Sequence, residues 1–194
     1  MIRHCPWAHK ALQVLTISAD MRDLKINKKS SSTRNPTAAW VFQNLWRMIA
    51  FGFGSGLLRP APGTWGTLFA WLIWVVALQG LSDVTVAVGL LLAFVLGCVA
   101  CERAGRALGV SDHGGMVWDE MVAFWLVLWL VPDSLVAQAV AFVLFRLFDI
   151  LKPQPIRYFD ARIKGGFGVM WDDIVAAAYC LLVMAVVVTL GAFA

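Results

Sequence analysis

The chain has 194 residues, and 60% of them are Ala, Val, Ile, Leu, Met, Phe, Trp, Tyr or Cys. Soluble domains contain roughly 45–50% apolar residues even with glycine included, and one core of this length cannot bury so much apolar surface. Only 14% of the residues are charged, and the mean hydropathy is +0.75. The composition therefore argues against a secreted, disordered or ordinary cytosolic protein and favours an integral membrane protein.

The net charge of +4 is unevenly distributed. Residues 1–50 hold eight Lys or Arg against two Asp, whereas residues 51–194 hold eight Lys or Arg against ten Asp or Glu. The basic character therefore belongs to the N-terminal segment, and the hydrophobic body is slightly acidic. Because no basic stripe with interleaved aromatic residues occurs in the body, we expect no nucleic-acid partner.

The polarity of the chain changes near residue 40, which predicts two parts. Residues 1–39 are predicted to form a flexible basic tail and residues 40–194 a membrane-embedded domain. Residues 36–51 have the pattern of an interfacial amphipathic helix, in which Trp40 and Trp46 would lie at the level of the lipid headgroups.

Five apolar runs of about 15–21 residues follow a glycine- and proline-rich segment, and each is near the lower length limit of a membrane span. They occupy residues 65–81, 84–101, 117–131, 135–151 and 174–194. The sequence therefore predicts an all-α membrane bundle of about five short spans. The alternative is a soluble helical bundle with unusually apolar helices, which the shortness of the runs would permit.

The distribution of cations predicts the orientation of these spans. Lys and Arg occur in the N-terminal segment, between residues 52 and 64, in the loops 102–116 and 152–173, or at their boundary, and five spans place these segments on one side. By the positive-inside rule that side is the cytoplasm, and the C-terminus faces the opposite side. We therefore expect the active-site loops on the cytoplasmic side.

Two acidic clusters resemble one another. Residues 114–123 read GGMVWDEMVA and residues 165–176 read GGFGVMWDDIVA, so each has two glycines, a tryptophan, two carboxylates and the start of an apolar run. Each copy is predicted to place its acidic pair in the first turn of a membrane helix. Capping of the helix N-terminus, worth about 0.3–1 kcal/mol, would explain one acid per helix but explains two doubled pairs poorly.

A fifth acid, Asp149, is expected at the same depth as these two pairs. Several carboxylates converging at low dielectric repel one another unless a cation neutralises them. Oxygen ligands without a His or Cys set favour a hard divalent ion, Mg²⁺ first. Because neighbouring helical residues point about 100° apart, one acid of each pair is expected to bind the metal and the other to act nearby.

Basic and glycine-rich segments supply candidate phosphate-binding groups. The segment 52–66 lacks the ending of a P-loop, but its backbone N–H groups could bind a phosphate. The alternative is that this segment only ends the interfacial helix and links it to the first span. The candidate phosphate-binding residues in and beside this segment are Gly54, Ser55, Arg59, Thr64 and Thr67.

The stretch 145–156, FRLFDILKPQPI, carries charges in and just after an apolar run. Arg146 and Asp149 are three residues apart and share a helix face. The functional interpretation places Asp149 on the metal and Arg146 and Lys152 on a phosphate. The alternative is an Arg146–Asp149 ion pair, with Lys152 extending to the interface.

His113 precedes the first acidic pair. It is interpreted either as the proton donor to a leaving alkoxide or as a solvated loop histidine.

Four blocks together carry a resemblance over roughly residues 42–194: GFGSGLLRPAPGTWGTL, DHGGMVWDE, FRLFDILKPQPI and GGFGVMWDDIVA. They resemble the bacterial phosphatidylglycerophosphatase A family. The resemblance implies a phosphoric monoester hydrolase of phospholipid biosynthesis, which uses Mg²⁺ at the inner membrane to convert phosphatidylglycerophosphate to phosphatidylglycerol and phosphate. The family's acids match Asp119, Glu120, Asp149, Asp172 and Asp173, and its basic positions match Arg59, Arg146 and Lys152.

The resulting hypothesis assigns a role to each candidate residue. The metal ligands are Asp119, Asp149 and Asp172, and the catalytic groups are His113, Glu120 and Asp173. The substrate-binding residues are Gly54, Ser55, Arg59, Thr64, Arg146 and Lys152. Attack by water and a covalent aspartyl-phosphate both stay open. The rival classes are a small transporter or channel with the acids as an ion path, and a non-catalytic membrane assembly factor.

Overall fold

The computed structural model describes residues 35–152, 154 and 165–191. Within these ranges the chain forms helices and no strand, which confirms the predicted all-α class. Residues 1–34 of the predicted tail and half of the predicted loop 152–173, namely residues 153 and 155–164, lie outside the described residues. The described helices are α2 (Ala38–Phe42), α3 (Leu45–Ala50), η1 (Gly52–Leu57), α4 (Pro62–Ile73), η2 (Trp74–Leu78), α5 (Asp83–Leu108), α6 (Trp118–Leu130), α7 (Leu135–Leu151) and α9 (Gly166–Thr189).

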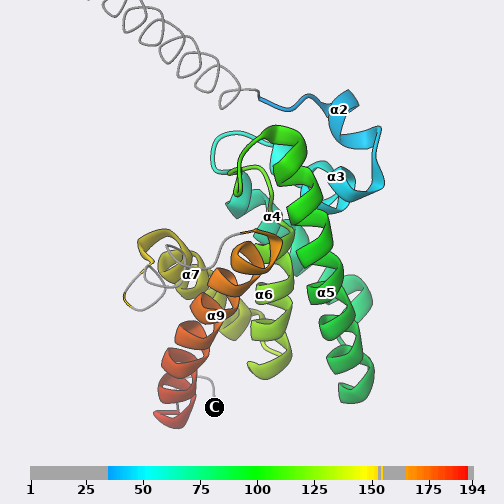
Figure 1. The fold of residues 1–194 in the computed structure, drawn as a ribbon. Helices are drawn as coiled ribbons and strands as arrows, with labels where there is room; N and C mark the ends of the chain where they lie inside the picture. Colours follow the sequence, from blue (N-terminus) through cyan, green and yellow to red (C-terminus); the bar gives the residue numbers. More distant parts are fainter. Residues whose placement is uncertain (1–34, 153, 155–164, 192–194) are drawn as a thin grey trace, which may run out of the picture. The chain divides into compact units, whose positions relative to one another are not determined.

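Helix α6 lies at the centre and packs against α4, α5, α7 and α9 (Figure 1). Phe124 of α6 stacks on Phe145 of α7 with ring centroids 5.5 Å apart. The indole N–H of Trp118 donates to a backbone carbonyl of α5 at 3.0 Å, and that of Trp125 donates to one of α4 at 2.8 Å. A buried indole N–H needs such an acceptor, so the two tryptophans fix α6 against both neighbours.

The outward faces of the long helices are apolar. Helices α5 and α9 are long and apolar enough to cross a membrane, and only 17% and 33% of their most apolar windows are buried. Val84 of α5 is 74% exposed and Leu182 of α9 is 66% exposed. The core helices of soluble proteins are mostly buried, unlike these two. Exposed apolar surfaces of this width mark contact with a membrane or with another protein.

All five predicted apolar runs are helical, but they differ in length. Helix α4, continued by the π-helical turn η2, is a shorter apolar helix of residues 62–78. Helices α6 and α7 contain 13 and 17 residues. Among the described residues, α5 and α9 alone have the length and hydropathy required of a full span.

Three predicted boundaries are wrong. Residues 36–51 form two short helices rather than one, because Asn44 leaves the helical conformation and its side chain accepts a hydrogen bond from Trp46 N at 3.0 Å. Helix α5 continues to Leu108, past the predicted end at residue 101. Helix α9 begins at Gly166, eight residues before the predicted start.

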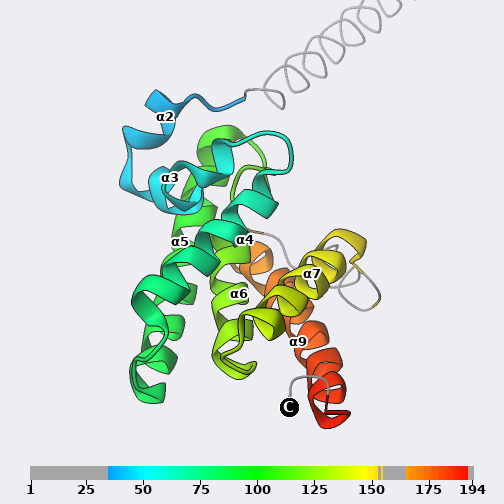
Figure 2. The same ribbon diagram turned by 180° about the vertical axis from the view of Figure 1, so that it is seen from behind.

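The helix ends that carry Glu102, Arg146, Asp149 and the two acidic pairs gather at one end of the bundle (Figure 2). Helices α4, α6 and α9 begin at this end, and α5 and α7 finish there. The connections 79–82 and 131–134 lie towards the other end. Side chains from α4, α6, α7 and α9 can therefore meet in one site.

Candidate active site

An ion network of three side chains lies where α6 and α7 meet. Arg146 Nη1 is 2.8 Å from Glu120 Oε1 and 2.7 Å from Asp149 Oδ2, and the three side chains are 12%, 14% and 11% exposed. The structure thus forms the Arg146–Asp149 pair that the sequence offered as the alternative to phosphate binding. It adds Glu120, which the sequence placed on another helix without a partner.

Helix α4 packs small residues against this network. Thr67 Oγ1 donates to the carbonyl of Gly63 at 2.9 Å and accepts from Arg146 Nη1 at 3.5 Å. A Cβ on Gly63 would collide with Glu120 Oε1 and would lie 2.7 Å from Arg146 Nη2. Sequence reasoning assigned Thr67 to a phosphate and gave Gly63 no role. The close packing of α4 could have been recognised from its small residues at positions 63, 66, 67 and 70, which repeat at helical spacing.

The second acidic pair lies on α9 beside the network. Asp172 and Asp173 are 5% and 4% exposed. Lys152 Nζ is 3.4 Å from Asp172 Oδ2, and Asp173 shares a hydrogen bond with the side chain of Asp149. Two carboxyl groups in such contact need a shared proton or a cation between them, because two like charges cannot both stay ionised there unaided.

The position of this pair corrects the predicted helix start. Because α9 begins at Gly166, Asp172 and Asp173 lie in its second turn and not in its first. Asp119 and Glu120 do lie in the first turn of α6, as predicted. Capping of the helix terminus can account for the α6 pair but not for the α9 pair, since the effect of the helix dipole falls off within the first turn.

Several buried carboxylate oxygens have no hydrogen-bond donor. Within the described part of the chain, Asp119 Oδ1, Glu120 Oε2 and Asp173 Oδ2 accept no hydrogen bond. Leaving a charged oxygen buried in this way is costly, and a bound cation would relieve the cost. In donor chemistry the cluster therefore fits a hard divalent ion.

The described acidic side chains lie too far apart for three of them to share one metal ion in the observed arrangement. In residues 35–152, 154 and 165–191, no three His, Cys, Asp or Glu side chains are arranged so that they could hold one metal ion. Binding of an ion by Asp119, Asp149 and Asp172 would therefore require these side chains to move towards one another.

His113 lies in the loop before α6 with its ring against Phe51, at a centroid distance of 5.8 Å. Its Nδ1 accepts a hydrogen bond from Gly115 N at 3.1 Å, so the proton of the neutral ring is on Nε2. Burial and the nearby Arg59 lower the pKa of His113, and Asp112 opposes them. The neutral ring can therefore donate a hydrogen bond through Nε2 at pH 7.

The glycine-rich segment is divided between two places. The backbone of Gly56 packs so closely on Gly115 that a Cβ would collide, which joins η1 to the loop of His113. Arg59, which follows η1, lies near the His113 ring. Gly54 and Ser55 instead line an apolar groove of about 430 Å³ on the exposed side of α4. The structure thus separates Gly54 and Ser55 from the small residues of α4 that touch the ion network.

Two of the predicted phosphate ligands in this segment have internal partners. Ser55 Oγ donates to Gly52 O at 2.8 Å. Thr64 lies in the first turn of α4, where its N–H donates to Ala61 O at 3.1 Å.

The sequence model of the phosphatidylglycerophosphatase A family matches residues 48–188, which contain every side chain of the ion network. The chain belongs to this family. It is a family of phosphoric monoester hydrolases, which confirms the predicted class of enzyme.

Three relatives extend the match. The phosphatidylglycerophosphatase A of Haemophilus influenzae is 46% identical over 77% of this chain and 93% of its own length. The Escherichia coli protein of the same name is 40% identical over 69% of this chain and 77% of its own length. A Bacteroides thetaiotaomicron relative, named as a candidate phosphatidylinositol-3-phosphatase, is 39% identical over 72% of this chain and 91% of its own length. No solved structure matches the chain.

Proposed function

We propose that this enzyme hydrolyses phosphatidylglycerophosphate to phosphatidylglycerol and inorganic phosphate, with Mg²⁺ as its cofactor. The observation that carries the proposal is the cluster of buried carboxylates around Arg146, drawn from α6, α7 and α9, in a chain of this family. The names of the two relatives with 46% and 40% identity supply the substrate.

The proposed location is the inner membrane, with the site on the cytoplasmic side. The exposed apolar faces of α5 and α9 support a lipid surrounding. Helix α3, the connection after η1 and the last turns of α5 lie near the end of the bundle that holds the cluster. They carry Arg47, Arg59, Arg103 and Arg106, which supports a cytoplasmic orientation by the positive-inside rule. A lipid phosphate at the membrane surface would then lie at the level of the charged helix ends.

The residues of the cluster divide into three proposed roles. Asp119, Asp149 and Asp172 would hold Mg²⁺, which when bound supplies Lewis-acid polarisation of the phosphoryl group. Glu120 and Asp173, each with an oxygen that accepts no hydrogen bond from the described residues, would orient the attacking water.

Arg146 and Lys152 would stabilise charge on the phosphoryl oxygens. In the structure both pair with carboxylates, so substrate phosphate would compete with Asp149 and Asp172 for these cations. His113, with its proton on Nε2, would donate a hydrogen bond to the leaving glycerol oxygen.

The test is phosphate release by the purified protein from phosphatidylglycerophosphate in mixed micelles, with Mg²⁺ or with EDTA. We expect release with Mg²⁺ and its loss with EDTA. Asp173→Asn should lower kcat by about 10²-fold or more, because a group that orients or deprotonates the nucleophile is removed. No release by the wild type would overturn the substrate assignment, and full activity in EDTA would overturn the Mg²⁺ assignment.

A matched control is Asp83→Asn, because Asp83 lies at the start of α5, far from the carboxylate cluster. Asp83 accepts a hydrogen bond from the Trp129 indole, which an Asn side chain retains, so we expect activity within about twofold of the wild type. Phosphatidylinositol 3-phosphate should be assayed in parallel because of the name of the third relative. Faster hydrolysis of that lipid would also contradict the proposal.

A further inference from the structure

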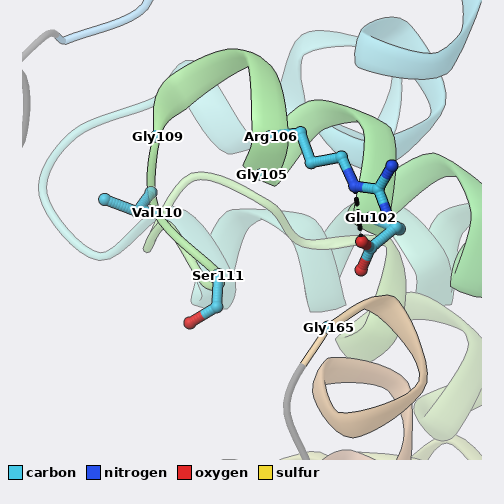
Figure 3. Close-up of a pocket in the computed structure, with 7 residues that line it drawn as sticks. All are labelled: Glu102, Gly105, Arg106, Gly109, Val110, Ser111 and Gly165. Carbon is cyan, nitrogen blue, oxygen red and sulfur yellow. Dashed lines mark hydrogen bonds and ion pairs between the residues drawn. The ribbon is translucent and has the colours of Figure 1, made fainter.

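The first turn of α9 packs on α5, and the Glu102 side chain of α5 makes a hydrogen bond to it. Glu102 Oε2 accepts a hydrogen bond from Gly166 N, the first residue of α9, at 2.8 Å. Its other oxygen, Oε1, lies 2.7 Å from Arg106 Nε one turn along α5. Figure 3 shows this pair on the wall of a hollow of about 300 Å³, with Gly165 facing it from the start of α9.

Among the described residues, Gly165 at the N-cap position of α9 supplies no side-chain cap, and Glu102 takes that place. The residue before its first turn is Gly165, which has no side chain to accept from the free N–H groups that begin every helix. A carboxylate at that position also interacts favourably with the positive end of the helix dipole. Glu102 therefore supplies from a neighbouring helix what local sequence supplies to α5 and α7 through Ser82 and Ser134.

The two helices touch here through backbone. A Cβ on Gly166 would collide with the carbonyl of Cys98 and would lie 2.8 Å from Glu102 N. With glycine at this position, the start of α9 lies directly on one turn of α5, and the hydrogen bond to Glu102 fixes it along that turn.

Asp172 and Asp173 follow on the same uninterrupted helix. At a rise of 1.5 Å per residue, they lie about 9 and 10.5 Å along α9 from Gly166. A shift of the first turn is transmitted by the helix to both carboxylates. We propose that Glu102 is a positioning residue, which holds α9 so that Asp172 and Asp173 meet Lys152 and Asp149. The proposal rests on the proposed function of that cluster.

The two oxygens of Glu102 predict different effects of substitution. The Arg106 side chain is 78% exposed, and an exposed ion pair contributes little. The bond to Gly166 N lies between two packed helices. Glu102→Gln keeps an acceptor oxygen for Gly166 but loses the ion pair and the small interaction of its charge with the helix dipole. Glu102→Ala loses all three, and Arg106→Ala is the matched control that loses the ion pair alone.

The experiment measures kcat and KM on phosphatidylglycerophosphate together with amide hydrogen exchange in the segment 166–173. For Glu102→Ala we expect kcat to fall about tenfold with KM within about twofold, because a misplaced catalytic group lowers turnover more than binding. Amide exchange at the start of α9 should accelerate about tenfold as that turn opens more often. Glu102→Gln and Arg106→Ala should stay near the wild type in both measurements.

Three results would overturn the inference: unchanged kcat and exchange in Glu102→Ala, the same losses in Glu102→Gln, or the same losses in Arg106→Ala. If Glu102→Ala does not fold, Glu102→Asp takes its place, with a smaller loss expected in the same two measurements. If the wild type releases no phosphate, the proposed function fails. The exchange measurement then still decides separately whether Glu102 fixes α9.

Discussion

At the scale of single residues, one guanidinium holds together side chains from two helices. Arg146 Nη1 pairs with Glu120 and Asp149, and these three side chains are nearly buried. A buried ion pair is costly to form, but removing one member costs more because the remaining charges lose their partner. The exposed pair of Arg106 and Glu102 provides a comparison within the same protein.

Arg146→Ala is expected to lower stability by about 3–5 kcal/mol, because Glu120 and Asp149 lose their common cation. At roughly 2–4 °C per kcal/mol, the thermal midpoint in detergent should fall by on the order of 10 °C. Arg106→Ala should cost about 1 kcal/mol or less. Equal midpoints for the two variants, measured by the near-UV circular dichroism signal, would show that the network contributes no stability.

At the scale of elements, hydropathy located all five long helical segments but not their polar ends. The apolar run of α5 stops at residue 101, yet the helix continues through Glu102 to Leu108. Helix α9 likewise begins at Gly166, eight residues before the apolar run that predicted it. These two extensions pack on each other, and we attribute their helical conformation to this contact. Hydropathy reports only which residues face an apolar surrounding, so it does not predict them.

The candidate site was predictable to the same extent. The acidic pairs and Arg146 were visible as charges at the ends of apolar runs. The pairing of Arg146 with Glu120 was not, because the sequence does not say which face of α6 meets α7. Gly63 was missed for a similar reason, since its role is the absence of a side chain where α4 meets Glu120.

Gly63→Ala tests that contact between elements. The added methyl group would collide with Glu120 Oε1 and crowd Arg146, so the pair must separate. We expect kcat/KM to fall by at least about tenfold, since small displacements of catalytic groups are costly.

The control for this substitution is Gly89→Ala on α5, where an added Cβ would meet nothing within 4 Å. Alanine there should leave activity unchanged and raise stability by up to about 1 kcal/mol. If both variants kept wild-type activity, close packing of α4 on the network would not matter for catalysis.

At the scale of the whole molecule, charge and apolar surface are arranged along one axis. The C-terminal ends of α5 and α7 and the N-terminal ends of α6 and α9 lie together, whereas the connections 79–82 and 131–134 at the other end contain no Lys or Arg. Moving an Arg or Lys into the bilayer centre costs about 2.5–3.5 kcal/mol, and cationic loops are retained in the cytoplasm. The proposed topology therefore has a strong preferred direction.

Labelling by a membrane-impermeant maleimide tests this direction in a variant without the four native cysteines. Ser111 and Asp133 are both exposed and lie in loops at the opposite ends of α6. Asp133→Cys should react in intact cells, because the proposed topology places its loop on the outer side. Ser111→Cys should react only after the membrane is opened, because its loop lies with the cations. Since the site lies at the Ser111 end, the reverse pattern would place the carboxylate cluster outside the cell.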